Sequence, residues 1–106
     1  MRQLLIKYQG IPCGLLRELI YNKQYQFSYF PDYKGPAISL TLPVQDTPYN
    51  FDAFPSFFDG LLPEGIQLEA LLRQRKIDYN DYMAQLAIVG EDLVGAVTAH
   101  ELEDAQ

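Results

Sequence analysis

The sequence has few of the residues that form disulfide bonds or bind structural metal ions. Its 106 residues include no tryptophan, one cysteine (Cys13) and one histidine (His100). A single thiol excludes an internal disulfide and favours a reducing compartment. One Cys and one His, separated by most of the chain, do not match a metal-binding spacing. We therefore predict no metal and no cofactor, a half-buried Cys13 and a surface His100.

Basic residues are also scarce. Eight Lys and Arg residues stand against 14 Asp and Glu residues, which gives a formal net charge of −6. Lys and Arg supply most of the affinity of proteins for phosphate backbones, so a direct nucleic-acid partner is disfavoured. The charge is uneven, because residues 1–34 carry +3 and residues 35–72 carry five acids and no base. Such an acidic surface suits a partner with a basic surface.

Long apolar runs are missing as well. Near the N-terminus only three apolar residues precede Lys7, which is too short for the core of a signal peptide. No stretch approaches the length of a membrane span. We therefore predict a cytoplasmic protein without membrane contact. Because 106 residues cannot bury two cores, we expect a single domain over residues 1–100.

The sequence is rich in aromatic rings, with 8 Tyr and 6 Phe. These rings can anchor a small core, and buried Tyr hydroxyls then need hydrogen-bond partners. Period-two alternation predicts strands. Strands are expected over residues 3–8, 25–29 and 37–42, with a last strand over 93–99 in the centre of the sheet. Residues 15–21 fit a strand or a short helix, and both remain open.

Helical spacing of apolar residues follows a loop predicted over residues 43–56. Phe54, Phe57, Phe58, Leu61 and Leu62 recur at the spacing of one helix face. Further helices are predicted over residues 64–76 and, capped by Asp78, over 79–89. Residues 101–106 read as an acidic tail. The order predicts an α+β domain, a small antiparallel or mixed sheet with about three helices packed on one face.

Catalytic motifs are not recognisable, so we predict that the chain is not an enzyme. Its few serines lack the context of an activated nucleophile. The segment from Gly90 to Gly95 has two glycines but neither the third glycine nor the Lys-Ser/Thr of a phosphate-binding loop. Carboxylate chemistry would need two acids facing each other across a cleft, and charged helix ends and turns explain the acid pairs more simply.

A dense aromatic and acidic segment, residues 57–65, is the best candidate for partner contact. Adjacent Phe57 and Phe58 cannot both lie on the centre line of one buried helix stripe. Spacing assigns Phe54, Phe58, Leu61 and Leu62 to the core. The predicted partner-binding residues are Phe57, Asp59, Pro63, Glu64 and Gly65, together with Glu91 and Asp92.

Four segments, in order along the chain, resemble the N-terminal subdomain of HipA-type proteins. They are Phe-Ser-Tyr at 27–29 followed by Pro31, Pro-Ala-Ile-Ser-Leu-Thr-Leu-Pro at 36–43, Phe-Phe-Asp-Gly-Leu-Leu-Pro-Glu-Gly at 57–65, and Val-Gly-Glu-Asp-Leu-Val-Gly-Ala-Val at 89–97. The resemblance covers residues 3–99. HipA-type proteins are bacterial Ser/Thr kinase toxins of toxin–antitoxin systems, and their kinase core follows this subdomain.

The resemblance implies a partner. A free-standing copy of the subdomain is similar to HipS, the small component of three-part HipB–HipS–HipT systems, in which the HipT kinase lacks this subdomain. It implies an antitoxin that binds and inhibits a HipT-like Ser/Thr kinase, with a HipB-like DNA-binding protein joining through the complex. The alternative is a non-catalytic fragment of a full-length HipA-type kinase toxin.

Overall fold

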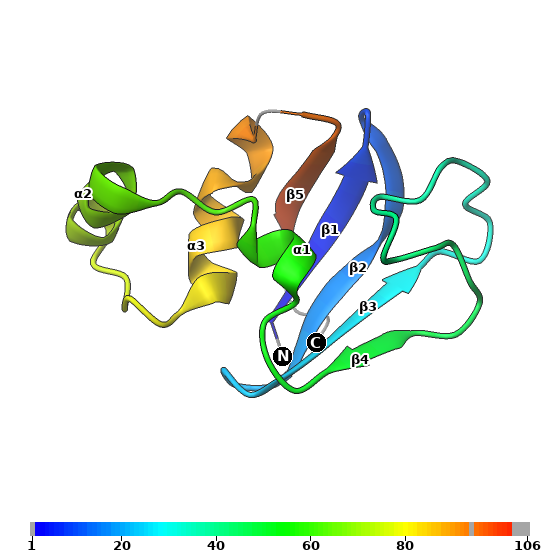
Figure 1. The fold of residues 1–106 in the computed structure, drawn as a ribbon, viewed down its shortest axis with the longest axis horizontal. Helices are drawn as coiled ribbons and strands as arrows, with labels where there is room; N and C mark the ends of the chain where they lie inside the picture. The colour runs from blue at the N-terminus through cyan, green and yellow to red at the C-terminus, as the bar shows by residue number, and fades with distance from the viewer. Residues whose placement is uncertain (1, 94, 103–106) are drawn as a thin grey trace.

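The computed structural model describes residues 2–93 and 95–102 and consists of one antiparallel sheet with helices on one face (Figure 1). The five strands lie in the order β4-β3-β2-β1-β5. The predicted α+β class, with three helices on one face of the sheet, is confirmed. The elements are β1 (Arg2–Tyr8), β2 (Ile11–Ile20), β3 (Gln24–Tyr29), β4 (Tyr49–Phe51), α1 (Ser56–Asp59), α2 (Gly65–Arg75), α3 (Tyr82–Val89), the 3-10 turn η1 (Gly90–Asp92) and β5 (Val97–Leu102).

The first two strands form a hairpin whose turn is Gln9-Gly10. Both residues have positive φ, 50° and 81°, as a tight hairpin turn requires. The segment that fitted a strand or a helix is β2, and its alternate residues Leu16 and Glu18 are buried. The buried acid interrupts the apolar pattern, which is why periodicity alone left this segment open.

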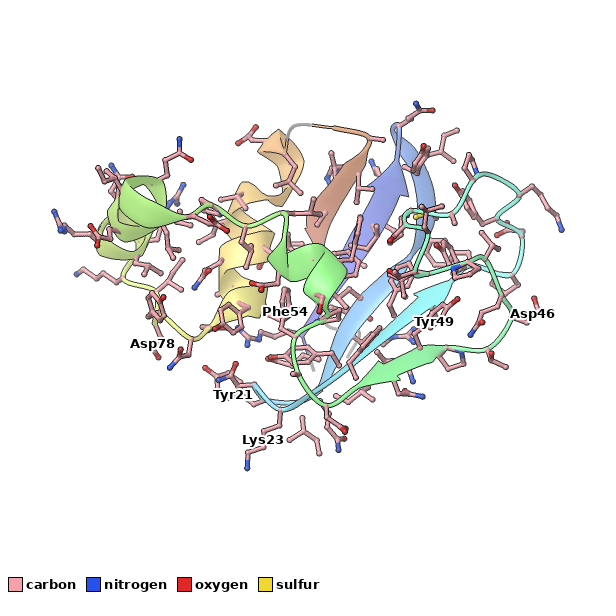
Figure 2. The ribbon with its side chains drawn as sticks, viewed as in Figure 1. Tyr21, Lys23, Asp46, Tyr49, Phe54 and Asp78 are labelled. Atoms are coloured by element: carbon pink, nitrogen blue, oxygen red, sulfur yellow. The ribbon has the colours of Figure 1, made fainter. Side chains whose placement is uncertain are left out.

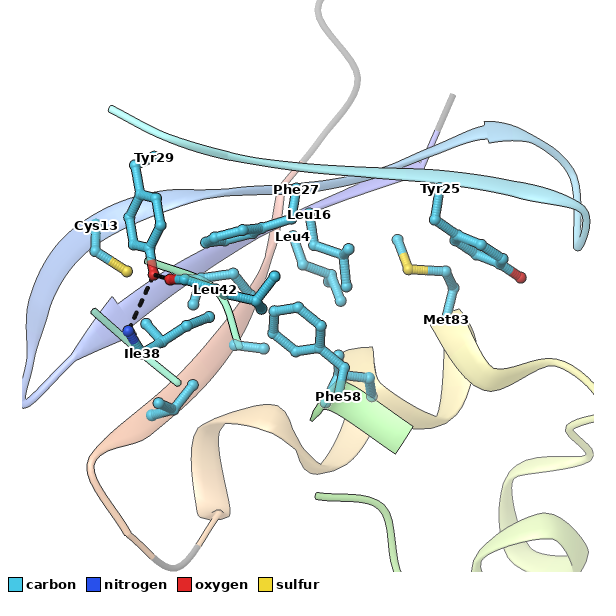
Figure 3. Packing of buried hydrophobic residues seen from close by; sticks show 14 of the residues in the cluster. Leu4, Cys13, Leu16, Tyr25, Phe27, Tyr29, Ile38, Leu42, Phe58 and Met83 are labelled. Atoms are coloured by element: carbon cyan, nitrogen blue, oxygen red, sulfur yellow. Dashed lines mark hydrogen bonds between the residues drawn. The ribbon is translucent and has the colours of Figure 1, made fainter. Parts of the chain in front are cut away.

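The core lies between the sheet and the helices. Its fully buried rings include Phe27 from β3 and Phe58 from α1, whose centroids are 5.7 Å apart (Figure 3). Leu4 and Leu16 of the neighbouring strands complete the layer, and Met83 and Leu86 of α3 close it from the helix side. The prediction that Phe58 and Leu62 belong to the core is confirmed, while Phe54 and Leu61 are half-buried.

The strand predicted over residues 37–42 does not form. Within it, Ser39 and Leu42 make one isolated bridge. The hydroxyl of Tyr29 instead accepts a hydrogen bond from the Ile38 amide at 3.0 Å and donates one to the Leu42 carbonyl. Ile38 and Leu42 are therefore buried as parts of a loop, and Leu40 between them is fully exposed.

The loop predicted over residues 43–56 does contain a strand. Its three residues, Tyr49–Phe51, pair with β3 and form one edge of the sheet. Figure 2 labels Tyr49 and, in the connection that precedes it, Asp46. The Tyr49 hydroxyl donates a hydrogen bond to the Pro43 carbonyl at the start of this connection. A tyrosine side chain thus fixes this long connection, as Tyr29 fixes the segment before it.

The last strand was wrongly placed in the centre of the sheet. β5 pairs with β1 alone among the named strands and lies at the edge opposite β4. It begins at Val97 and runs to Leu102, so Glu101 and Leu102 belong to a strand and not to the predicted tail. Residues 103–106 lie outside the described residues, and the division of the chain at residue 100 stays a prediction.

The first and third helices are shorter than predicted. α1 spans only Ser56–Asp59, because Pro55 precedes it and the chain turns after Gly60. α3 begins at Tyr82, and its N-cap is Asp81 instead of the predicted Asp78. The Asp81 carboxylate accepts a hydrogen bond from the Ala84 amide at 3.3 Å. None of the helices in the described residues has the length and apolarity needed to cross a bilayer.

An ion-pair network fastens α3 to the sheet. The Arg2 guanidinium donates two hydrogen bonds to the buried Glu18 carboxylate, at 2.6 and 2.7 Å, and lies 2.9 Å from Asp81. The hydrogen bonds to Glu18 raise the pKa of Arg2. The buried acid is therefore neutralised in place, and the N-terminal end of α3 is tied to β1 and β2.

Candidate partner-binding site

A groove of about 590 Å³ lies between α2 and the α3–η1 segment. Its wall is mainly apolar, with Leu61, Pro63, Leu71, Ile88 and Leu93. Asp92 and Arg75 also line it and bring charges of opposite sign to the groove. An apolar cleft with a few polar groups is the usual form of a binding site.

The helix that forms one side of this groove is weakly packed. α2 is 11 residues long and buries none of its side chains. Figure 1 shows it standing away from the sheet, beyond α3. Its apolar residues Leu68, Leu71 and Leu72 are only half-buried, and Ile66 in its first turn is 84% exposed. α2 thus presents apolar surface to solvent.

Four of the predicted partner-binding residues lie at or near this groove. Pro63 and Asp92 line it. Glu64 is the N-cap residue of α2 and Gly65 is its first residue, with φ of 60°, and both are exposed. The structure therefore brings together the 63–65 corner and one of the two acids of η1, which are far apart in the sequence.

The other three predicted residues lie elsewhere. Phe57 is half-buried, packed edge-on against Phe58 at 5.2 Å, and it lines a separate cavity beside β4. Asp59 is exposed at the end of α1. Glu91 is exposed, and its carboxylate lies 3.3 Å from Nδ1 of His100. The predicted set is thus distributed over more than one surface.

Another apolar hollow lies beside β4 on the helix side of the sheet. It has a volume of about 590 Å³, and its lining includes Leu42, Phe51, Phe54 and Phe57. Phe54, labelled in Figure 2, meets Tyr25 edge-on at 5.3 Å and Tyr82 at 5.6 Å. Phe54, which lines this cavity, therefore also belongs to the aromatic packing between β3 and α3.

Reactive groups in the described residues are poorly placed for chemistry. Cys13 is fully buried, not half-buried as expected, and burial raises the pKa of its thiol to about 11. A protonated, inaccessible thiol is a poor nucleophile. His100 is half-buried and lies 2.9 Å from Thr98. Within the described residues no three His, Cys, Asp or Glu side chains gather as a metal site.

Sequence reasoning missed Ile66, Leu71, Arg75 and Ile88, all of which lie on α2 or along the groove. One signal was available for Ile66, because this apolar residue directly follows the Pro-Glu-Gly corner. The contribution of Ile88 could not be read from the sequence, because it depends on where α2 lies relative to α3.

Comparison with known proteins decides the family. Residues 4–100 match the HipA N-terminal domain family. This chain belongs to that family. A solved structure described as the N-terminal domain of HipA toxin has the same fold, with a TM-score of 0.76, 29% identity and coverage of 99% of this chain and 96% of that one.

Two relatives place the family match in context. An uncharacterized protein of Haemophilus influenzae is 36% identical over 88 residues, which are 83% of this chain and 81% of that protein. A putative kinase of Sinorhizobium fredii, Y4dM, is 35% identical over 83 residues, 72% of this chain but only 20% of the kinase. The HipA-type domain thus occurs in a relative of similar length and as a minor part of a putative kinase.

Proposed function

We propose that this HipA N-terminal domain protein is an antitoxin that binds and inhibits a HipA-like Ser/Thr kinase of the HipT type in a three-part bacterial system. Family membership supports the link to HipA kinases. The relative of similar length supports a small separate protein. In this proposal the chain is cytoplasmic, lacks catalytic activity, and meets a HipB-like DNA-binding protein only through the complex.

The observation that carries the proposal is the weakly packed α2 beside an apolar groove. An isolated helix of 11 residues is marginal in water, so a partner that covers it would stabilise it. Exposed apolar patches of this kind mark interaction sites. Glu64 and Asp92 at the groove add negative charge that suits a basic kinase surface.

The physical basis is the separation of one chain into two. In a longer kinase this domain contacts the rest of the chain through an interdomain surface, and such surfaces are large enough for stable binding between separate proteins. A separately encoded domain makes that contact dissociable. Inhibition follows if the bound domain covers the nucleotide or substrate site, or if it binds an inactive kinase conformation more tightly.

Co-expression with a HipT-like kinase from the same genome tests the proposal. The wild-type chain should relieve the growth arrest caused by the kinase and should co-purify with it. Ile66→Asp should weaken both effects without unfolding the chain, because the side chain is 84% exposed. Leu40→Asp is the matched control, since Leu40 is also fully exposed but lies on the loop that follows β3. Growth arrest that persists with the wild-type chain, without co-purification, would overturn the proposal.

The second candidate is a non-catalytic fragment of a full-length HipA-type kinase toxin. The match to 20% of a putative kinase favours it. The genomic reading frame distinguishes the two. A separate start codon for a kinase that lacks this domain supports the antitoxin, and one continuous frame supports the fragment.

A further inference from the structure

The face of the sheet opposite the helices is uncovered in the described part of the chain. Strand residues alternate between the two faces, and the buried Leu4, Leu16 and Phe27 mark the helix side. Their neighbours Leu5 and Leu15, which pair across β1 and β2, therefore point to the other face. Figure 3 shows the helices on one side of the sheet only.

The charge on this helix-free face is opposite to that of the molecule. By the pairing register, β1 directs Lys7 to it and β2 directs Arg17 to it. In the regularly paired parts of the five strands, none of the side chains directed to this face is acidic. One acid from outside the strands reaches the edge of this face, where the Glu91 carboxylate lies 3.3 Å from His100 of β5. Lys7 and Arg17 still leave the face weakly basic in a chain of net charge −6.

A polar row crosses the face at one end. Gln3, Arg17, Gln26 and Asn50 stand side by side on four strands, by register. Arg17 donates a hydrogen bond to Gln26 at 3.3 Å, and Gln26 donates one to Asn50 at 3.1 Å. Next to this row lie the half-buried Leu5 and Leu15. An apolar centre flanked by polar groups is the usual anatomy of a protein–protein interface.

We propose that this helix-free face is a second docking surface for the kinase, and that it binds an acidic patch on it. The inference rests on the proposed function. Two cations with one polar row are too few for useful binding to a phosphate backbone, because that affinity grows with the number of phosphates neutralised. A protein surface with carboxylates fits better, since charge complementarity of this kind accelerates and orients docking.

The end of β5 indicates which part of the face lies nearest the kinase. The family match ends at residue 100, within β5. In a HipA protein, where this domain is N-terminal, the remaining chain follows from that strand. Leu102 pairs with Gln3, and Gln3 pairs with Arg17. Arg17 therefore lies at the end where the rest of a HipA kinase begins, and Lys7 lies toward the other end of β1.

Affinity for the purified HipT-like kinase used in the co-expression, measured at low and at physiological salt, tests the inference. Arg17→Glu with Lys7→Glu should weaken binding roughly tenfold or more at low salt and flatten its salt dependence. Arg17→Glu alone should have the larger single effect. The control is Lys23→Glu with Lys34→Glu, which makes the same charge change in a turn and a loop (Figure 2 labels Lys23) and should leave affinity near that of wild type.

The outcomes separate this inference from the proposed function. If the wild-type chain does not bind the kinase, the proposed function fails. If the wild-type chain binds and Arg17→Glu with Lys7→Glu binds equally well, or if the control pair weakens binding as much, the second docking surface is overturned and the antitoxin role stands. Should the Glu pair melt early by circular dichroism, Arg17→Gln with Lys7→Gln removes the charge at similar side-chain length, and an unchanged salt slope then overturns the inference.

Discussion

α3 and α2 follow each other in the chain but depend on different surroundings. α3 is eight residues long, buries Met83, Gln85 and Leu86, and is tied to the sheet through Asp81. α2 is three residues longer and buries nothing. The length of these two helices therefore does not indicate how firmly each one is packed. α3 is held by the core of its own chain, whereas α2 buries no side chain in the described structure.

The largest effect should come from the core that holds α3 and α1. Phe58→Ala removes a ring with no exposed surface that contacts Phe27. We expect a loss of about 3–5 kcal/mol in the free energy of unfolding, because both burial and close packing are lost. Urea denaturation measures it. Tyr79→Ala, a change at a 65% exposed ring in the α2–α3 connection, should cost far less, and equal losses would contradict the contrast.

The ion-pair network should come next. Glu18→Ala leaves Arg2 without its main partner and removes one anchor of α3. We expect a loss of about 2–3 kcal/mol, less than for a fully buried pair because Arg2 is partly exposed. Chemical denaturation of Glu18→Ala beside Glu69→Ala, an exposed acid in α2, gives the measurement. A loss of stability at Glu69 as large as at Glu18 would refute this assignment of the network.

The free energy of unfolding should fall at alkaline pH, in the range where the buried Cys13 and Tyr29 side chains ionise. Burial raises the pKa of Cys13 to about 11 and that of Tyr29 to about 12. Both groups are neutral when protonated, so the unfolded chain loses its protons at lower pH than the folded chain. Stability should be constant below about pH 8, where the thiol of the unfolded chain begins to ionise, and should fall by a few kcal/mol from there toward pH 12. Thermal melts across this range measure it.

The tyrosine part of this pH dependence has its own control. Tyr29→Phe should lower stability at all pH values, since it leaves the Ile38 amide and Leu42 carbonyl without their hydroxyl partner. It should also flatten the alkaline slope. Tyr79→Phe, at an exposed ring, should leave the slope unchanged. An alkaline slope in Tyr29→Phe as steep as in wild type would assign the effect to other groups.

The smallest global effect is expected in α2. Ala70→Gly lowers intrinsic helix stability by about 1 kcal/mol, but the free energy of global unfolding should change by less than about 0.5 kcal/mol because little of the core depends on α2. Hydrogen exchange should show fast exchange in α2 and slow exchange in α3. Binding of the kinase should then slow exchange in α2, and an α2 that is as protected as α3 in the free chain would contradict the comparison.

Sequence patterns predicted the fold correctly where a segment's conformation follows from its own residues, without contacts from other parts of the chain. Tyr25, Phe27 and Tyr29 alternate and form a strand because all three face the same core. Residues 37–42 alternate as well, but a distant hydroxyl, that of Tyr29, binds their backbone and holds a loop. Such a contact leaves no local signal. The same holds for Glu18, whose burial depends on Arg2.

The candidate site was predictable only in part, for the same reason. The Pro63-Glu64-Gly65 corner could be predicted from the residue types of the segment itself. The approach of Asp92 to that corner depends on how α3 is anchored. That anchoring needs Gly90, where a side-chain carbon would lie 2.3 Å from the Ala99 carbonyl oxygen of β5. Close backbone approach of this kind is set by tertiary packing and cannot be read from a glycine in a sequence.

The pairing of Gln3 with Leu102 has a consequence for protein engineering. The first and last described strands are neighbours in the sheet, so a short linker can join them without crossing the molecule. New ends can be opened in the exposed connection at residues 43–48, which lies outside the core. The fold is thus suited to circular permutation, and a permuted chain would place a fluorescent or affinity tag far from both α2 and β5.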